Sequence, residues 1–175
     1  MSHLSALAAI AAAGLLALPG SLPAAMAETV VVHDGAGDAP PAMDVTRVRF
    51  RNNAEFISAR VHVAELTRRP LRFVSFLFYR THAQDDGASA SAWIDEGGDL
   101  TTMLSHQPDD QGQVDCRFHV HWRAADDFVY FRVPRRCITA AHVRDTGSLR
   151  MYASTATVEA DGEQTEKTLV RKGPG

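Results

Sequence analysis

Two histidines, His119 and His121, form a His-x-His pair within residues 114–123, VDCRFHVHWR. A β-strand presents alternate side chains on one face, so this spacing can direct two imidazoles toward one zinc or copper ion. His62 is the candidate to complete such a site, because it also falls on an outward position of a predicted strand. Arg132 is expected opposite His121, and its charge opposes a divalent cation. The pattern favours a solvated polar face, and metal binding by these histidines is the alternative.

Arginines occupy the outward positions of several predicted strands. A guanidinium matches the geometry of carboxylate and phosphate groups, so a basic sheet face can bind an anionic polymer or an acidic partner. Arg47 and Arg132 are therefore candidate ligand-binding residues, together with His119 and His121. The alternative is that these arginines only keep a wet sheet face soluble. The outward arginines are Arg47, Arg49, Arg51, Arg60, Arg117, Arg123 and Arg132.

Most acidic side chains fall in predicted loops. Loops that meet at one end of a sandwich can bind calcium through oxygen ligands, but no stretch matches a defined calcium loop. We therefore predict no cofactor and keep calcium as an alternative. The loop acids are Asp34, Asp38, Asp85, Asp86, Asp95, Glu96, Asp99, Asp109, Asp110, Asp126 and Asp127.

The two tryptophans are the aromatic residues that could stack on a sugar ring. Trp122 lies on the inward phase of its predicted strand, so we expect it in the core. Trp93 is opposite in phase to Ile94 and close to a loop, which makes it the candidate carbohydrate ligand. Catalytic residues are not indicated, because the chain lacks a G-x-S-x-G elbow and no carboxylate pair stands out from the loop acids.

Alternating apolar and polar residues predict the strands that position these groups. Polar turns separate the strands, and no helical period of useful length follows the N-terminal segment. These features predict an all-β protein, an antiparallel β-sandwich of roughly 8–10 strands. The predicted strands are 29–33, 46–51, 57–63, 71–79 (central), 88–94, 99–105, 114–123, 128–133, 148–158 and 167–171.

The two cysteines, Cys116 and Cys137, are predicted to form a disulfide across a hairpin. Placing them opposite each other makes facing residue numbers sum to 253, which puts Val120 opposite Val133 and Trp122 opposite Phe131. This register joins the apolar faces of the two strands, and a slip of one residue would separate them.

The N-terminal segment predicts secretion. Residues 4–18 are apolar and small, and the segment ends in Ala25-Met26-Ala27, an A-x-A cleavage pattern. We read residues 1–27 as a signal peptide and residues 28–175 as a single β-sandwich domain. A disulfide fits the oxidising compartment that secretion supplies. The formal net charge of −3 does not suggest nucleic-acid binding, and no later stretch predicts a transmembrane segment.

The chain resembles a group of small secreted proteins from high-GC Gram-positive bacteria. The shared features are the signal peptide, Gly37-Asp38-Ala39, a strand opening at Asp44-Val45-x-x-Val48, and Val133-Pro134-Arg135-x-Cys137-Ile138. The chain departs from this group at residues 94–98, IDEGG, where an Ile-Asp-Thr-Asp-like strand end is expected. More distantly, it is similar to the sandwiches of carbohydrate-binding module family 9 and DOMON-like domains. That similarity implies a β-sandwich and suggests sugar or haem binding.

Together, the sequence predicts a secreted, non-catalytic β-sandwich module with a binding or structural role outside the cell. The candidate partners are a cell-wall or extracellular glycan, or an anionic partner. The two alternatives are a carbohydrate-binding module that uses Trp93, and a metal-binding protein that uses the His-x-His pair.

Overall fold

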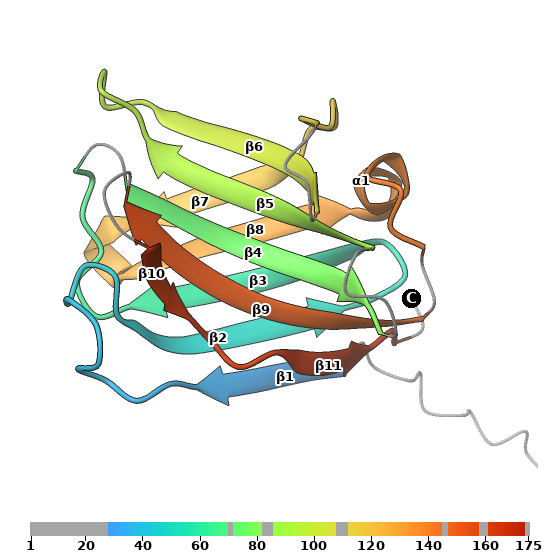
Figure 1. Cartoon of the computed structure of the whole chain (residues 1–175), viewed down its shortest axis with the longest axis horizontal. Helices are drawn as coiled ribbons and strands as arrows, with labels where there is room; N and C mark the ends of the chain where they lie inside the picture. The colour runs from blue at the N-terminus through green and yellow to red at the C-terminus, as the bar shows by residue number, and fades with distance from the viewer. Residues whose placement is uncertain are drawn as a thin grey trace, which may run out of the picture.

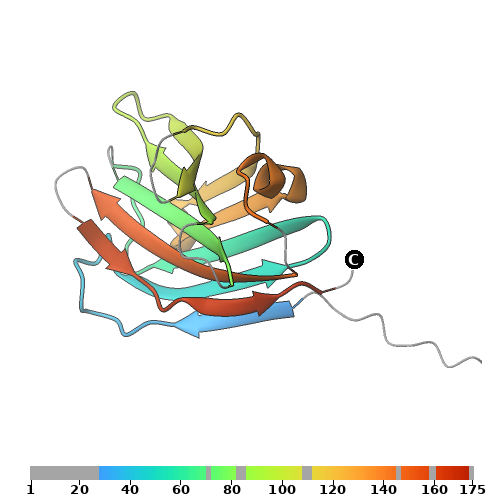
Figure 2. The same cartoon turned by 45° about the vertical axis from the view of Figure 1, so that its right-hand side comes forward.

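The structure is a computed structural model that describes residues 28–69, 72–81, 86–107, 112–144, 147–157 and 161–173. The predicted signal peptide, residues 1–27, lies outside the described residues. Two antiparallel sheets pack face to face, as the sequence predicts, and the views in Figures 1 and 2 show both layers. None of the described helices is long and apolar enough to cross a membrane.

The first sheet has the strand order β1-β2-β3-β8-β7. Its strands are β1 (Glu28–His33), β2 (Val45–Asn52), β3 (Phe56–Val63), β8 (Phe128–Pro134) and β7 (His119–Arg123). A 3₁₀ turn, η1 (Ala124–Asp126), joins β7 to β8, and a short helix, α1 (Arg135–Ala140), follows β8 directly.

The second sheet has the order β10-β9-β4-β5-β6, and β11 also pairs with β9. Its strands are β10 (Asp161–Gln164), β9 (Ser148–Thr157), β4 (Arg72–Arg80), β5 (Gly87–Ile94), β6 (Leu100–Gln107) and β11 (Thr168–Arg171). The predicted central place of the 71–79 strand is confirmed by β4. Strand β11 runs beside β1 at one edge of the sandwich in both views (Figures 1 and 2).

The core lies between the sheets and is built from alternate residues of each strand. Phe50 and Phe131 of the first sheet both contact Phe76 of the second, with ring centroids 5.9 Å and 6.3 Å apart. All three side chains are fully buried. Burying a phenylalanine contributes about 1.5–3 kcal/mol, so this aromatic contact fixes how the two sheets pack.

The disulfide between Cys116 and Cys137 is present, with the two Cα atoms 5.4 Å apart. The register that we inferred from it is wrong by two residues, because Val120 faces Phe131 and not Val133. Neither cysteine lies in a strand: Cys116 precedes β7, and Cys137 lies in α1. The bond therefore joins an irregular segment to a helix, and it sets no strand register.

Candidate functional site

An arginine-rich surface covers the outer side of the first sheet, and we call it the arginine face. Its members are exposed because they alternate along β2, β3 and β8 with fully buried apolar residues. Alternate side chains of a strand point to opposite sides, so the same pattern that fills the core directs these guanidiniums outward. The arginine face consists of Arg47, Arg49, Arg51, Arg60 and Arg132.

The strand register places these arginines at neighbouring positions of adjacent strands. Arg49 of β2 lies directly opposite Arg60 of β3. Ser58 of β3 lies between Arg51 on one side and Arg132 on the other. Like charges that face each other across strands destabilise a sheet, so this pairing is unfavourable unless an anion neutralises it.

No carboxylate among the described residues forms an ion pair with the arginine face. Ion pairs elsewhere in the described part of the chain include Arg80 with Asp86, at 3.3 Å, and Arg123 with Asp126, at 2.9 Å. The charge of the arginine face is therefore not neutralised by the described acids.

Aromatic side chains hold two of these guanidiniums in place. The Cζ of Arg60 lies 4.5 Å from the ring centroid of Phe128, and the Cζ of Arg132 lies 4.2 Å from that of Phe56. Contacts of this kind contribute roughly 0.5–1 kcal/mol at exposed sites and restrict the guanidinium to a few orientations. The arginine face therefore has a partly preorganised geometry.

A shallow depression of about 230 Å³ lies in the middle of the arginine face. Three guanidiniums and two hydroxyl groups line it, which is a set of hydrogen-bond donors suited to an oxyanion. The lining residues are Arg49, Arg51, Ser58, Arg60 and Tyr130.

The three candidate metal-binding histidines are not brought together. His119 and His121 are exposed on β7, where His119 lies opposite Arg132 and His121 opposite Tyr130. The prediction that Arg132 faces His121 is therefore wrong, which follows from the two-residue shift in register. His62 lies on β3 and is separated from β7 by β8.

His62 instead lies beside the arginine face and contacts it through Arg47. Its Nε2 lies 2.9 Å from a guanidinium nitrogen of Arg47. Burial lowers the pKa of His62, and the positive charges of Arg47 and Arg60 lower it further. A neutral imidazole can accept a hydrogen bond from the guanidinium, so His62 orients Arg47 at neutral pH.

Trp93 lies on the outer side of the second sheet, in β5, half-buried. Its ring contacts that of Phe73 on β4, with centroids 5.3 Å apart and an angle of 36° between planes. On the same side, Tyr79 and Tyr152 stack with centroids 5.8 Å apart. Trp93 is the next-to-last residue of β5, so it is close to the loop that follows, as the sequence indicates, and it pairs with Phe73 of β4 and Thr101 of β6.

Two of the predicted loop acids, Asp34 and Asp38, meet a third acid, Glu163 of β10. We did not predict Glu163, because it lies in a short strand that the sequence pattern did not reveal. Among the other loop acids, Asp85, Asp109 and Asp110 lie outside the described residues.

The comparison with protein-family models finds no match, and no curated protein matches the chain.

Proposed function

We propose that this protein is a secreted, non-catalytic binding module whose arginine face binds an anionic extracellular polymer, such as an acidic glycan. The observation that supports this most is the unneutralised pairing of Arg49 with Arg60 across β2 and β3. A bound anion would remove this repulsion, so the sheet gains stability and the ligand gains affinity from the same contact.

The chemistry of the arginine face suits a repeating anion. Arginine donates two parallel hydrogen bonds to a carboxylate, sulfate or phosphate, and such charge-assisted bonds are stronger than neutral ones. The positive charges extend over three adjacent strands, from Arg47 on β2 to Arg132 on β8. A polymer with several charges can contact them at once, whereas a single small anion fills only the central depression.

Secretion is consistent with the covalent structure. The Cys116–Cys137 disulfide is typical of proteins in oxidising compartments. The sequence of residues 1–27 predicts the signal that would direct the chain there. An extracellular module would meet acidic glycans at the cell surface.

The direct test is binding to a sulfated dextran, with uncharged dextran of the same length as the control. We expect the wild-type protein to bind the sulfated polymer and an Arg49→Ser/Arg60→Ser variant to bind at least ~10-fold more weakly, a loss of about 1.4 kcal/mol. Arg144→Ser/Arg150→Ser is the matched control, because it also removes two exposed arginines, and both lie outside the arginine face. Equal losses in both variants would show a general charge effect and refute the site.

A second candidate function is the binding of neutral sugars by the outer side of the second sheet. The contact between Trp93 and Phe73 favours it, because an aromatic ring at a surface can stack on a sugar. A Trp93→Ala variant should then lose binding on an array of neutral glycans. The His-x-His alternative is tested separately by zinc titration, with His119→Ala and His121→Ala as variants.

A further inference from the structure

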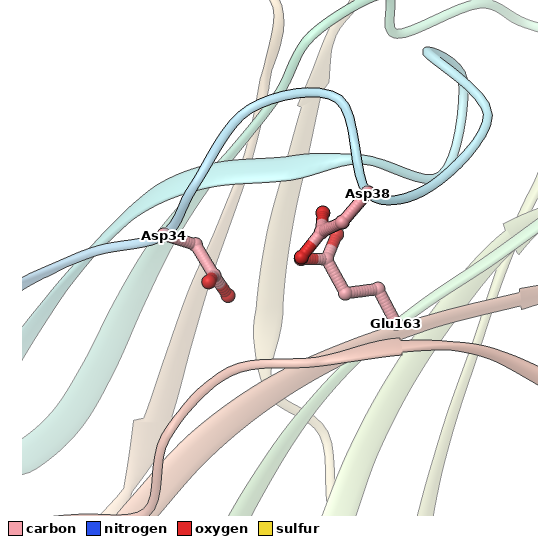
Figure 3. A group of neighbouring side chains, drawn as sticks. All are labelled: Asp34, Asp38 and Glu163. Carbon is pink, nitrogen blue, oxygen red and sulfur yellow. The ribbon is translucent and has the colours of Figure 1, made fainter.

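Three carboxylates from distant parts of the chain converge at one edge of the sandwich. Asp34 and Asp38 belong to the β1–β2 loop, and Glu163 belongs to β10 (Figure 3). One oxygen from each of the three lies within 4.8 Å of the others. Calcium binds oxygens at 2.3–2.6 Å, so ligands around one ion are separated by up to about 5 Å. The spacing of these oxygens fits a single ion.

A fourth carboxylate, Asp44, provides an independent observation. Asp44 is only 3% exposed, and its Oδ1 has no hydrogen-bond partner. Its other oxygen, Oδ2, accepts a hydrogen bond from the backbone N–H of Gly37, at 2.7 Å, so the carboxylate lies against the loop between Asp34 and Asp38. A buried carboxylate oxygen without a partner is costly, and a cation is the natural partner for it.

Glu163 also has a buried carboxylate oxygen without a hydrogen-bond partner. Its Oε2 accepts a hydrogen bond from the backbone N–H of Val45, the residue after Asp44, and its Oε1 is buried without a partner. The pKa of Glu163 is raised to about 7, mainly by burial and in part by the negative charges of Asp34, Asp38 and Asp44, whereas the hydrogen bond from Val45 acts to lower it. Asp44 and Glu163 therefore each have a buried carboxylate oxygen without a partner, and Val45, the residue after Asp44, connects them through its hydrogen bond to Glu163.

We propose that Asp34, Asp38 and Glu163 form a calcium site, and that the buried carboxylate of Asp44 beside them adds negative charge that favours the ion. All the side-chain ligands are carboxylates, and such hard oxygen donors suit calcium or magnesium and not zinc or copper. Calcium is preferred over magnesium because its flexible coordination accepts ligands from a loop and a strand without ideal octahedral geometry. This site is separate from the arginine face and does not depend on the function proposed for it.

The calcium ion would join the two sheets at one edge. Asp34, Asp38 and Asp44 lie between two strands of the first sheet, whereas Glu163 lies on the edge strand of the second. The loop already contacts the second sheet, because Thr155 of β9 donates a hydrogen bond to the carbonyl of Met43. Calcium would replace the repulsion among the four acids by attraction, and so hold β10 against the loop.

Calcium binding is measured by isothermal titration of the disulfide-bonded protein after EDTA treatment, with magnesium titrated in parallel. We expect a dissociation constant in the submillimolar range that is typical of extracellular modules, roughly 10⁻⁴–10⁻³ M or tighter, and calcium bound at least ~10-fold more tightly than magnesium. Glu163→Gln and Asp44→Asn should each weaken calcium binding at least ~10-fold. Glu166→Gln is the matched control, because Glu166 is exposed and lies outside the cluster.

Thermal melts with and without calcium also test the site in the wild type, so this result does not depend on whether the variants fold. Without calcium, Glu163→Gln should melt at a higher temperature than the wild type, because it removes one of the four repelling charges. With calcium, the wild type should gain several degrees and the variant should gain little. The proposal is overturned if calcium neither binds nor raises the melting temperature of the wild type, if magnesium matches calcium, or if Glu166→Gln loses as much affinity as Glu163→Gln.

Discussion

Removing the disulfide should cost the protein a large part of its stability. Cys116 and Cys137 are separated by 21 residues, and closing a loop of this length stabilises the folded state by roughly 3 kcal/mol in the chain-entropy account. For a domain of about 150 residues, this corresponds to a decrease of about 6–12 °C in melting temperature. The fold itself should persist, because Ile138 is fully buried and its apolar contacts also hold α1 in the core.

The assay compares urea unfolding of the oxidised protein, of the same protein in reductant, and of a Cys116→Ala/Cys137→Ala variant. Reduction leaves both sulfur atoms in place, so it measures the cross-link without creating a cavity at the fully buried Cys137. We expect both reduced and variant proteins to lose roughly 3 kcal/mol, with the variant slightly less stable. A loss below about 1 kcal/mol on reduction would refute the loop-closure reasoning.

Three further predictions concern the core, one turn and the acidic cluster. Phe76→Ala should lower the free energy of unfolding by about 3–5 kcal/mol in urea melts, because Phe76 is fully buried between the sheets, whereas Leu77→Ala on the outer side should cost clearly less. Asp127 has a φ of 51°, and its Oδ1 accepts a hydrogen bond from the N–H of Leu66, so Asp127→Ala should cost about 1–2 kcal/mol in the same assay. Asp127→Asn keeps the hydrogen-bond acceptor and tolerates the positive φ, so an equal loss in this variant would contradict the explanation. In EDTA, the raised pKa of Glu163 means that the folded state holds a proton that the unfolded state has released, so the free energy of unfolding should fall as pH rises from 4.5 to about 7. The lowered pKa of His62 acts in the opposite direction, so the profile of Glu163→Gln is subtracted from that of the wild type. A difference profile that is flat or rises with pH would contradict the prediction.

Most strands were predictable from the sequence because the two faces of each sheet have different environments. Arg47, Arg49 and Arg51 alternate with buried residues in β2, so the composition of both faces follows from a period of two. The same reasoning failed at the disulfide, because apolar residues repeat every two positions and a shift of two preserves the alternation. Helix α1 was missed because six residues are too few to establish a helical period.

The candidate sites were predictable only in part. Alternation placed the arginines on one face, but the pairing of Arg49 with Arg60 depends on register, which sequence pattern alone does not determine. Asp34 and Asp38 were recognised as loop acids. Their partner Glu163 lies more than a hundred residues along the chain, in a strand of four residues, and only the folded chain brings it to the loop. Nothing local in the sequence distinguishes it from other acids.

The most direct test of the central proposal is the salt dependence of binding to the sulfated dextran. If the arginine face is the site, the logarithm of the binding constant should fall as the logarithm of the salt concentration rises, because each neutralised charge releases counterions. The slope should become shallower in Arg49→Ser/Arg60→Ser and stay unchanged in Arg144→Ser/Arg150→Ser. Binding that is independent of salt, or a slope that the double substitution leaves unchanged, would contradict the proposal.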